Sequence, residues 1–188
     1  MPEQGDTMTL TQTGQAYADL NALAEAKGWP IRCDGDLAFE RKELCELCEL
    51  WRSKAANGVP ARSAFGMRAL KSYARNITIM EREGLKGARR YRFRLFGSTL
   101  ALLFGEHTGR MLDEMVSAEL LPSWLAFYDT VLSCGQPLRV VTYYRIQNEN
   151  YLKGEILAAP LADDSGDVRM ILAATYVGLQ DGVPPPFG

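Results

Sequence analysis

The segment Arg90–Gly109, RYRFRLFGSTLALLFGEHTG, sets the expected fold. It starts with basic and apolar residues in strict alternation, which is the pattern of a β-strand with two different faces. The small residues Gly97 and Ser98 break this pattern, and a short apolar helix follows. A strand that turns directly into a helix forms a corner, and such corners often form one wall of a pocket.

Strand patterns occur on both sides of this segment. Residues 76–81 precede it and are expected to form a hairpin with its first strand. Three further strands are expected at 138–146, 152–161 and 168–179, joined by turns rich in Asn and Asp. Hairpin connections make the sheet antiparallel. The last two strands are apolar at nearly every position, so we expect helices on both faces of the sheet.

Helical patterns before and between the strands are expected to supply these covers. Residues 17–27 form a short helix, and residues 40–56 form a longer helix with one apolar stripe and one charged side. A third helix, at 122–134, separates the second strand from the third, and Pro122 suits its first turn. Shorter helical segments are expected at 66–73, 99–104 and 111–115.

This order predicts an α+β fold with a five-stranded antiparallel sheet. A helical crossover joins the second and third strands and covers one face, and an N-terminal helical extension packs on the outer face. We expect three parts. These are a lead-in with a short helix at 1–39, the folded domain with its covering helix at 40–179, and a proline-rich tail at 180–188.

Composition and charge indicate an ordinary globular protein. The chain has 188 residues, of which 47% are hydrophobic and 23% charged, and its net charge of -2 gives no general attraction to nucleic acid or anionic membranes. We see neither a leader sequence nor an apolar run long enough to cross a bilayer. The four cysteines are scattered, as in reduced proteins, so we expect a cytoplasmic protein that contacts no membrane.

The order of the elements resembles that of the PAS domain. More narrowly, it is similar to a bacterial family of single PAS domains of undefined function, found mostly in alphaproteobacteria. The resemblance covers roughly residues 44–179, and short motifs carry it: Trp51, Pro60–Arg62, Tyr91–Leu95, Gly97-Ser98, Phe104-Gly105, Thr108-Gly109 and Ala159–Leu161. The chain departs from the pattern at Ala64–Met67, where an acidic residue and a proline are expected.

The resemblance implies a sensory or regulatory module with no catalytic output of its own. Such a module binds a small apolar or aromatic ligand, a protein partner or both. The ligand is expected between the sheet and the crossover helices. The residues expected to face it are Phe93, Leu95, Phe104, Trp124, Phe127, Tyr128, Tyr143 and Tyr144. Strand register leaves open which of the last two points inward.

The same resemblance argues against two cofactors that PAS domains can bind. Haem-binding PAS domains take their iron ligand from the crossover helix, and Trp124–Cys134 contains no histidine. Flavin-binding relatives use a cysteine in an Asn-Cys-Arg context, which is absent from this sequence. We therefore expect neither haem nor flavin, and the sequence identifies no other cofactor.

A homodimer through the N-terminal helices is also implied. The residues expected at its interface are Leu44, Leu47, Cys48 and Trp51 on the apolar stripe, with Arg92 and Arg94 from the strand. Cys45 and Cys48 are spaced like a metal or redox pair. Both lie inside a helix, however, and no second ligand pair accompanies them, so we expect structural thiols and no metal.

Arg90, Arg92 and Arg94 form a basic row on one face of their strand, with Tyr91 and Phe93 on the opposite face. Nucleic acid binding would favour aromatic rings beside the basic groups, so we expect no nucleic acid partner. The arginines are expected to pair with acidic residues of the 40–56 helix or with a second subunit.

His107 and Asp129 are the residues on which an enzymatic interpretation depends. His107 is the only histidine and lies in a loop without a serine or cysteine motif, so we interpret it as a surface residue. Asp129 is the only carboxylate in the crossover helix, which is thin support for acid–base catalysis. The alternatives are therefore a small α+β enzyme of isomerase or hydratase type with a cone-shaped pocket, and a ligand-free structural adaptor.

Overall fold

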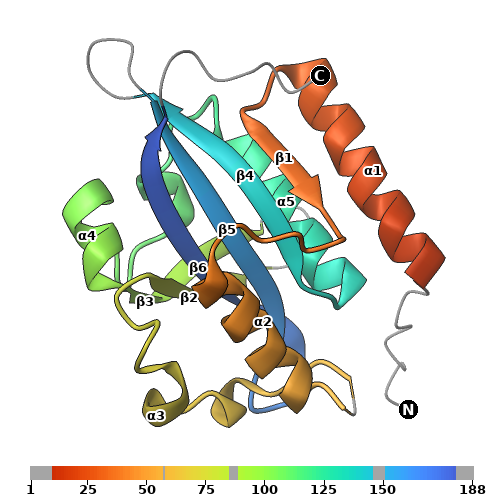
Figure 1. The fold of residues 1–188 in the computed structure, drawn as a ribbon, viewed down its shortest axis with the longest axis vertical. Coiled ribbons are helices and arrows are strands. Elements are labelled where there is room, and N and C mark those ends of the chain that lie inside the picture. Colours follow the sequence, from red (N-terminus) through yellow and green to blue (C-terminus); the bar gives the residue numbers. More distant parts are fainter. Residues whose placement is uncertain (1–9, 57, 85–88, 146–150, 181–188) are drawn as a thin grey trace.

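The computed structural model describes residues 10–56, 58–84, 89–145 and 151–180 (Figure 1). Its elements in chain order are α1 (Leu10–Lys27), β1 (Ile31–Asp34), α2 (Lys42–Lys54), the 3-10 turn η1 (Arg62–Ala64), α3 (Met67–Leu70), β2 (Ile77–Glu83), β3 (Arg90–Phe96), α4 (Ser98–Phe104), the 3-10 turn η2 (Leu112–Glu114), α5 (Leu121–Cys134), β4 (Leu138–Arg145), β5 (Tyr151–Ala162) and β6 (Val168–Gln180). None of the helices in these ranges has the length and apolar character needed to cross a bilayer.

The strands form one antiparallel sheet in the order β1-β4-β5-β6-β2-β3. The predicted α+β class, the five predicted strands and the helical crossover from β3 to β4 are confirmed. β1 is an additional sixth strand, which pairs with β4 through Cys33 and Val140. Four residues are too few to show a strand period, so the sequence pattern predicts no strand at Ile31–Asp34. Asn21 of α1 fixes it by donating to Cys33 O at 2.7 Å and accepting from the Cys33 N–H at 2.8 Å.

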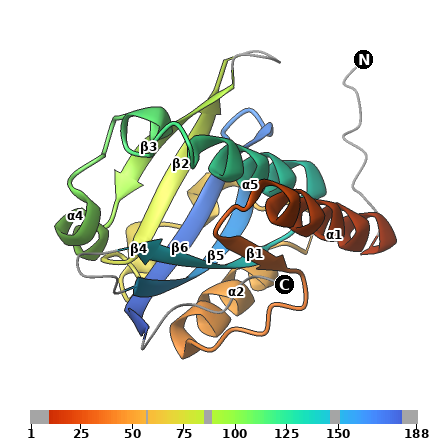
Figure 2. The same ribbon diagram turned by 90° about the horizontal axis from the view of Figure 1, so that it is seen from above.

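Helices cover both faces of the sheet, as the apolar strands predicted (Figure 2). α5 and α1 lie over one face, which we call the crossover face, and α2 lies over the other, which we call the outer face. α1 starts at Leu10, although the sequence pattern predicted a helix only from residue 17. Of the two N-terminal helices, α2 makes the predicted outer cover, whereas α1 packs beside α5.

The apolar stripe of α2 is buried against the sheet of the same chain. Leu44 and Leu47 have no exposed surface, and Cys48 and Trp51 are each 2% exposed. Burial raises the pKa of the Cys48 thiol, which keeps it protonated. The sheet therefore covers the stripe that the sequence predicted as a dimer interface and leaves almost none of its apolar surface exposed.

The N-terminal end of α2 lies against a buried carboxylate. Glu155 of β5 accepts hydrogen bonds from the backbone N–H groups of Glu40 at 2.8 Å and Arg41 at 3.0 Å. Arg139 of β4 donates to Glu155 at 2.6 Å and to Asp34 at 2.7 Å. The carboxylate thus satisfies N–H groups at the start of the helix and connects α2 to β1, β4 and β5.

The basic row of β3 pairs with acidic residues nearby: Arg90 binds Asp113 of η2 at 2.7 Å, and the other two arginines bind the neighbouring strand. Arg92 binds Glu83 at 2.7 Å, and Arg94 binds Glu81 at 2.6 Å. The expectation that these arginines pair with acidic residues of α2 is wrong, because β2 places two carboxylates directly beside β3. Both predicted interface arginines are therefore paired within the chain.

A β-bulge changes the direction of the side chains at the end of β3. The β2–β3 register shifts between Ile79 and Met80, so Arg94 is an extra residue in β3. Phe93 points into the core of the crossover face, whereas Leu95 packs on the outer core. The predicted alternation, which put Phe93 and Leu95 on one face, is wrong because of this bulge.

The corner after β3 requires Gly97. Its N–H donates to Ile77 O at 2.8 Å, and the Thr99 N–H donates to Arg75 O at 2.8 Å. A Cβ atom at Gly97 would lie 2.5 Å from Arg75 O. The backbone before β2 passes so close that a side chain has no room, and this contact holds the start of α4 in place.

We expect Gly97→Ala to lower the free energy of unfolding by about 1–3 kcal/mol, the usual cost of overpacking. Gly66→Ala is the matched control. Gly66 also precedes a helix with a φ of -66°, and a Cβ atom there meets nothing within 4 Å. The control should change the free energy of unfolding by about 0.5 kcal/mol or less. Urea denaturation measures both, and equal stability of the two variants would contradict the close approach.

Candidate ligand pocket

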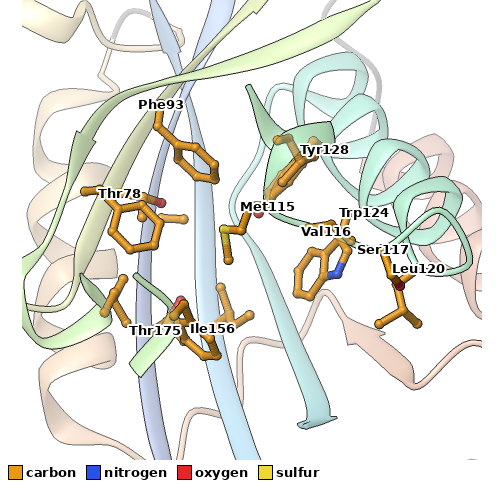
Figure 3. A pocket seen from close by; sticks show the side chains of 15 residues that line it. Thr78, Phe93, Met115, Val116, Ser117, Leu120, Trp124, Tyr128, Ile156 and Thr175 are labelled. Carbon is orange, nitrogen blue, oxygen red and sulfur yellow. The ribbon is translucent and has the colours of Figure 1, made fainter. Parts of the chain in front are cut away.

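A cavity of about 300 Å³ lies between the crossover face of the sheet and the segments that cross it (Figure 3). This volume is at the lower end of the range for small-molecule sites. The residues that line it are mostly aromatic or aliphatic: Thr78, Phe93, Phe96, Leu100, Phe104, Leu112, Met115, Val116, Ser117, Leu120, Trp124, Tyr128, Ile156, Ala173 and Thr175.

The cavity has a sheet side and a helix side. Figure 3 shows the strand side chains Phe93 and Ile156 across from Trp124 and Tyr128 of α5, with Met115 between them. Trp124 stacks on Tyr128 with ring centroids 5.9 Å apart, so α5 presents a broad aromatic surface. This arrangement suits an apolar or aromatic molecule.

The hydroxyl groups of two buried threonine residues interrupt the apolar lining on the sheet side. Thr78 of β2 is 6% exposed and Thr175 of β6 is 9% exposed. Among the residues that the structure describes, no hydrogen bond joins the side-chain hydroxyl of either threonine to another group. Both residues line the cavity, so a bound molecule is within reach of their hydroxyls.

The cavity contains half of the residues that the sequence predicted to face a ligand. Phe93, Phe104, Trp124 and Tyr128 line it. Phe127 is fully buried in the core beside them but forms no part of the lining. The aromatic stripe of α5 therefore serves both the core and the cavity.

The remaining predicted residues lie elsewhere. The bulge in β3 turns Leu95 to the outer face. Val140 points to the crossover face, so strand alternation places Tyr143 on the outer face. The side chain of Tyr144 lies outside the described part of the chain.

Several lining residues were missed, among them Thr78, Met115, Ile156 and Thr175. The sequence pattern around the two threonines could have indicated a ligand site. Each stands in an otherwise apolar strand that is covered on both faces, and a hydroxyl in such a position needs a partner. Met115 carried no signal, because methionine beside a short helical turn is equally common in a core.

His107 is buried beside the cavity, so the expectation of a surface residue is wrong. It is 9% exposed, and its Nε2 lies 2.9 Å from Phe104 O at the end of α4. Its Nδ1 is buried and has no hydrogen-bond partner among the described residues. The Gly109 N–H donates to Phe93 O at 2.7 Å, which folds the loop onto β3. This brings the imidazole to 5.4 Å from the Phe96 ring, between centroids.

Asp129, the carboxylate on which an enzyme would depend, does not line the cavity. It accepts a hydrogen bond from Tyr91 OH at 2.6 Å and pairs with Arg89 at 3.1 Å. Burial, and then the Asp129 carboxylate, raise the pKa of Tyr91. Tyr128 is the one ionisable side chain among the described lining residues. No group of three or more His, Cys, Asp or Glu in the described ranges could hold a metal ion.

A sequence profile of the PAS domain matches residues 40–175. This match spans well over half of the chain and includes every residue that lines the cavity. The chain therefore belongs to the PAS domain family, as the order of its elements indicated.

Solved structures similar to this chain are distant in sequence. A variant of the PAS-B domain of Drosophila melanogaster Cycle, solved with bound glycerol, is 15% identical with a TM-score of 0.41, over 55% of this chain and 99% of that chain. An RNA-binding light-oxygen-voltage receptor is 14% identical with a TM-score of 0.43, over 61% of this chain and 33% of that chain. The light-oxygen-voltage domain of the photoreceptor Aureochrome1 is 15% identical with a TM-score of 0.41, over 61% and 89%. No curated protein matches the chain.

Tyr91→Phe removes the hydrogen bond that joins β3 to α5 through Asp129. We expect the free energy of unfolding to fall by about 1–2 kcal/mol, somewhat less than for a fully buried bond to a charged group, because the Asp129 side chain is 33% exposed. Tyr73→Phe, at a half-buried tyrosine outside this contact, is the control and should change stability by about 0.5 kcal/mol or less. If thermal and urea denaturation find both variants equally stable, the Tyr91–Asp129 bond contributes nothing.

Proposed function

We propose that this PAS domain is a sensory or regulatory module that holds a small, largely apolar or aromatic ligand in the cavity on the crossover face. The family supports the general class, because PAS domains are generally sensory rather than catalytic. The cavity is the observation that carries the specific proposal. A largely apolar pocket of about 300 Å³ that reaches the surface at Leu120 is large enough for a small molecule.

The rim of the cavity supports ligand entry from solvent. Ser117 and Leu120 both line the cavity and are exposed at the surface, Leu120 by 36%. The opposite end, at the strands, is closed by buried side chains such as Ile156 and Ala173, each 3% exposed. A ligand would therefore enter between η2 and α5 and lie with one end against the sheet.

The homodimer through the N-terminal helices stays a prediction. Tyr17 and Leu20 of α1 are buried in the core of the crossover face, whereas Leu23 of α1 is 40% exposed. The apolar stripe of α2 is buried on the outer face. A dimer through these helices would use their exposed sides, which are mostly polar but include Leu23. Polar contacts of this kind suit a weak or regulated association better than an obligate one.

The cavity and its lining give less support to the two alternative functions, an enzyme and a ligand-free adaptor. An acid–base enzyme has less support, because Asp129 is bound to Tyr91 and Arg89 away from the lining. A ligand-free adaptor would be expected to have a filled core, which the open volume beside α5 does not match.

Ala173→Leu should reduce ligand binding and leave the fold intact. Ala173 is 3% exposed, lines the cavity and lies opposite Thr78 and Ala158, so a longer side chain extends into the open space. We expect the affinity for N-phenyl-1-naphthylamine, an uncharged aromatic fluorophore, to fall about tenfold or more. The free energy of unfolding should stay level or rise by up to about 2 kcal/mol, because filling a cavity usually stabilises a protein.

Fluorescence titration measures this affinity. Native mass spectrometry of protein purified without added ligand reports the retained small molecule and the oligomeric state together. Ala118→Leu, the same change at an exposed residue outside the lining, is the control and should bind like the wild type. A wild-type protein that binds no fluorophore and retains no small molecule would contradict the proposal.

A further inference from the structure

We infer that the cavity selects uncharged ligands with one hydrogen-bonding group, such as an alcohol, a phenol or a carbonyl, which Thr78 and Thr175 hold at the sheet. This inference rests on the proposed function and adds to it the chemical class of the ligand. Three features of the cavity support it: the placement of the threonines, the absence of charge among its described lining residues, and its size.

The two threonines are placed to serve the same ligand group. In the β2–β6 register Thr78 is opposite Ala173, so Thr175 occupies the diagonal position two residues further along β6. Diagonal neighbours in an antiparallel pair lie about 7–8 Å apart, with somewhat shorter distances between Cβ atoms. The Thr175 N–H donates to Asn76 O at 2.9 Å, and Asn76 Nδ2 donates to Thr175 O at 3.0 Å, which fixes the backbone of Thr175.

The threonine hydroxyls favour a ligand that can hydrogen-bond. Both residues, Thr78 and Thr175, are more than nine-tenths buried, and neither side-chain hydroxyl has a hydrogen-bond partner among the described residues. A hydroxyl left unpaired in an apolar site is unfavourable, and a ligand group that pairs with it removes this penalty. A hydroxyl both donates and accepts, so alcohols and carbonyl compounds both suit the site.

The lining disfavours charged ligands. Among the described residues that line the cavity, Tyr128 alone is ionisable, and it is 7% exposed. A carboxylate or phosphate in this space would lose its hydration without gaining an arginine or lysine partner from these residues. An ammonium group would equally find no carboxylate there.

The size and shape of the cavity favour a ligand of about two rings. A cavity of about 150 Å³ accommodates benzene, and this one has about 300 Å³. Figure 3 places Thr78 and Thr175 on one side of the cavity and Trp124 and Leu120 on the other. The polar group of the ligand is therefore expected at the sheet, with its apolar body against α5.

The test compares 2-naphthol with naphthalene in the wild type and in the double variant Thr78→Val/Thr175→Val. Valine keeps the shape of threonine and removes the hydroxyl. The measured quantity is the ratio of the two dissociation constants, from displacement of N-phenyl-1-naphthylamine, because the ratio cancels the general apolar attraction. We expect the dissociation constant of 2-naphthol to rise relative to that of naphthalene by about three- to tenfold for each threonine hydroxyl removed.

Matched controls separate hydrogen bonding from packing. Thr78→Ser/Thr175→Ser keeps both hydroxyls and should keep the wild-type ratio. 2-Naphthoate, which is anionic at neutral pH, should bind about tenfold more weakly than 2-naphthol, or weaker still. The valine variant should melt at the wild-type temperature or above it, because it loses two unpaired hydroxyls. If the double variant does not fold, each single variant gives the same comparison.

The outcomes distinguish this inference from the proposed function. An unchanged ratio in the valine variants overturns the inference and leaves the ligand site in place. Binding of 2-naphthoate as tight as that of 2-naphthol has the same effect. If the wild type binds none of these compounds and no fluorophore, the proposed function fails together with the inference.

Discussion

The structure depends on two central strands, β5 and β6, that are buried on both faces. Leu157 and Leu172 point to the outer face, whereas Ile156 and Ile171 point to the crossover face. A sheet of this kind needs a cover on each side. α2 supplies one cover, and the crossover from β3 to β4 supplies the other. The order of helices and strands along the chain follows from this requirement.

The same requirement explains why the cavity lies on the crossover face. At the cavity, β5 and β6 present Ile156 and the smaller Ala173 and Thr175. On the outer face, Leu157 and Leu172 lie with Ala159 and Ala174 beneath the continuous helix α2. The crossover consists of the short segments α4 and η2 before α5 begins. Short segments over small side chains leave space that a long helix with large residues would fill. The cavity therefore lies where short crossover segments pass over Ala173 and Thr175.

The apolar pattern was sufficient to predict the fold but not the local geometry of the site. Burial on both faces leaves a strong signal, so five strands, the crossover and the outer cover were predictable. The extra residue Arg94 leaves no such signal, yet it turns Leu95 away from the cavity. His107 was predicted at the surface because the sequence does not reveal the backbone hydrogen bond from Gly109 to Phe93, which folds the His107 loop inward. These features depend on contacts between segments, which periodicity within one segment cannot report.

The cavity and α2 contact opposite faces of the same strands. Along β2, Thr78 lines the cavity while its neighbours Ile77 and Ile79 pack in the outer core beneath α2. Along β6, Thr175 lines the cavity beside Ala174, which also belongs to the outer core. Successive residues of a strand point to opposite faces and share one backbone. A movement of β2 or β6 at the cavity therefore also moves the residues that pack against α2. The cavity and α2 are coupled directly through the backbone of these strands.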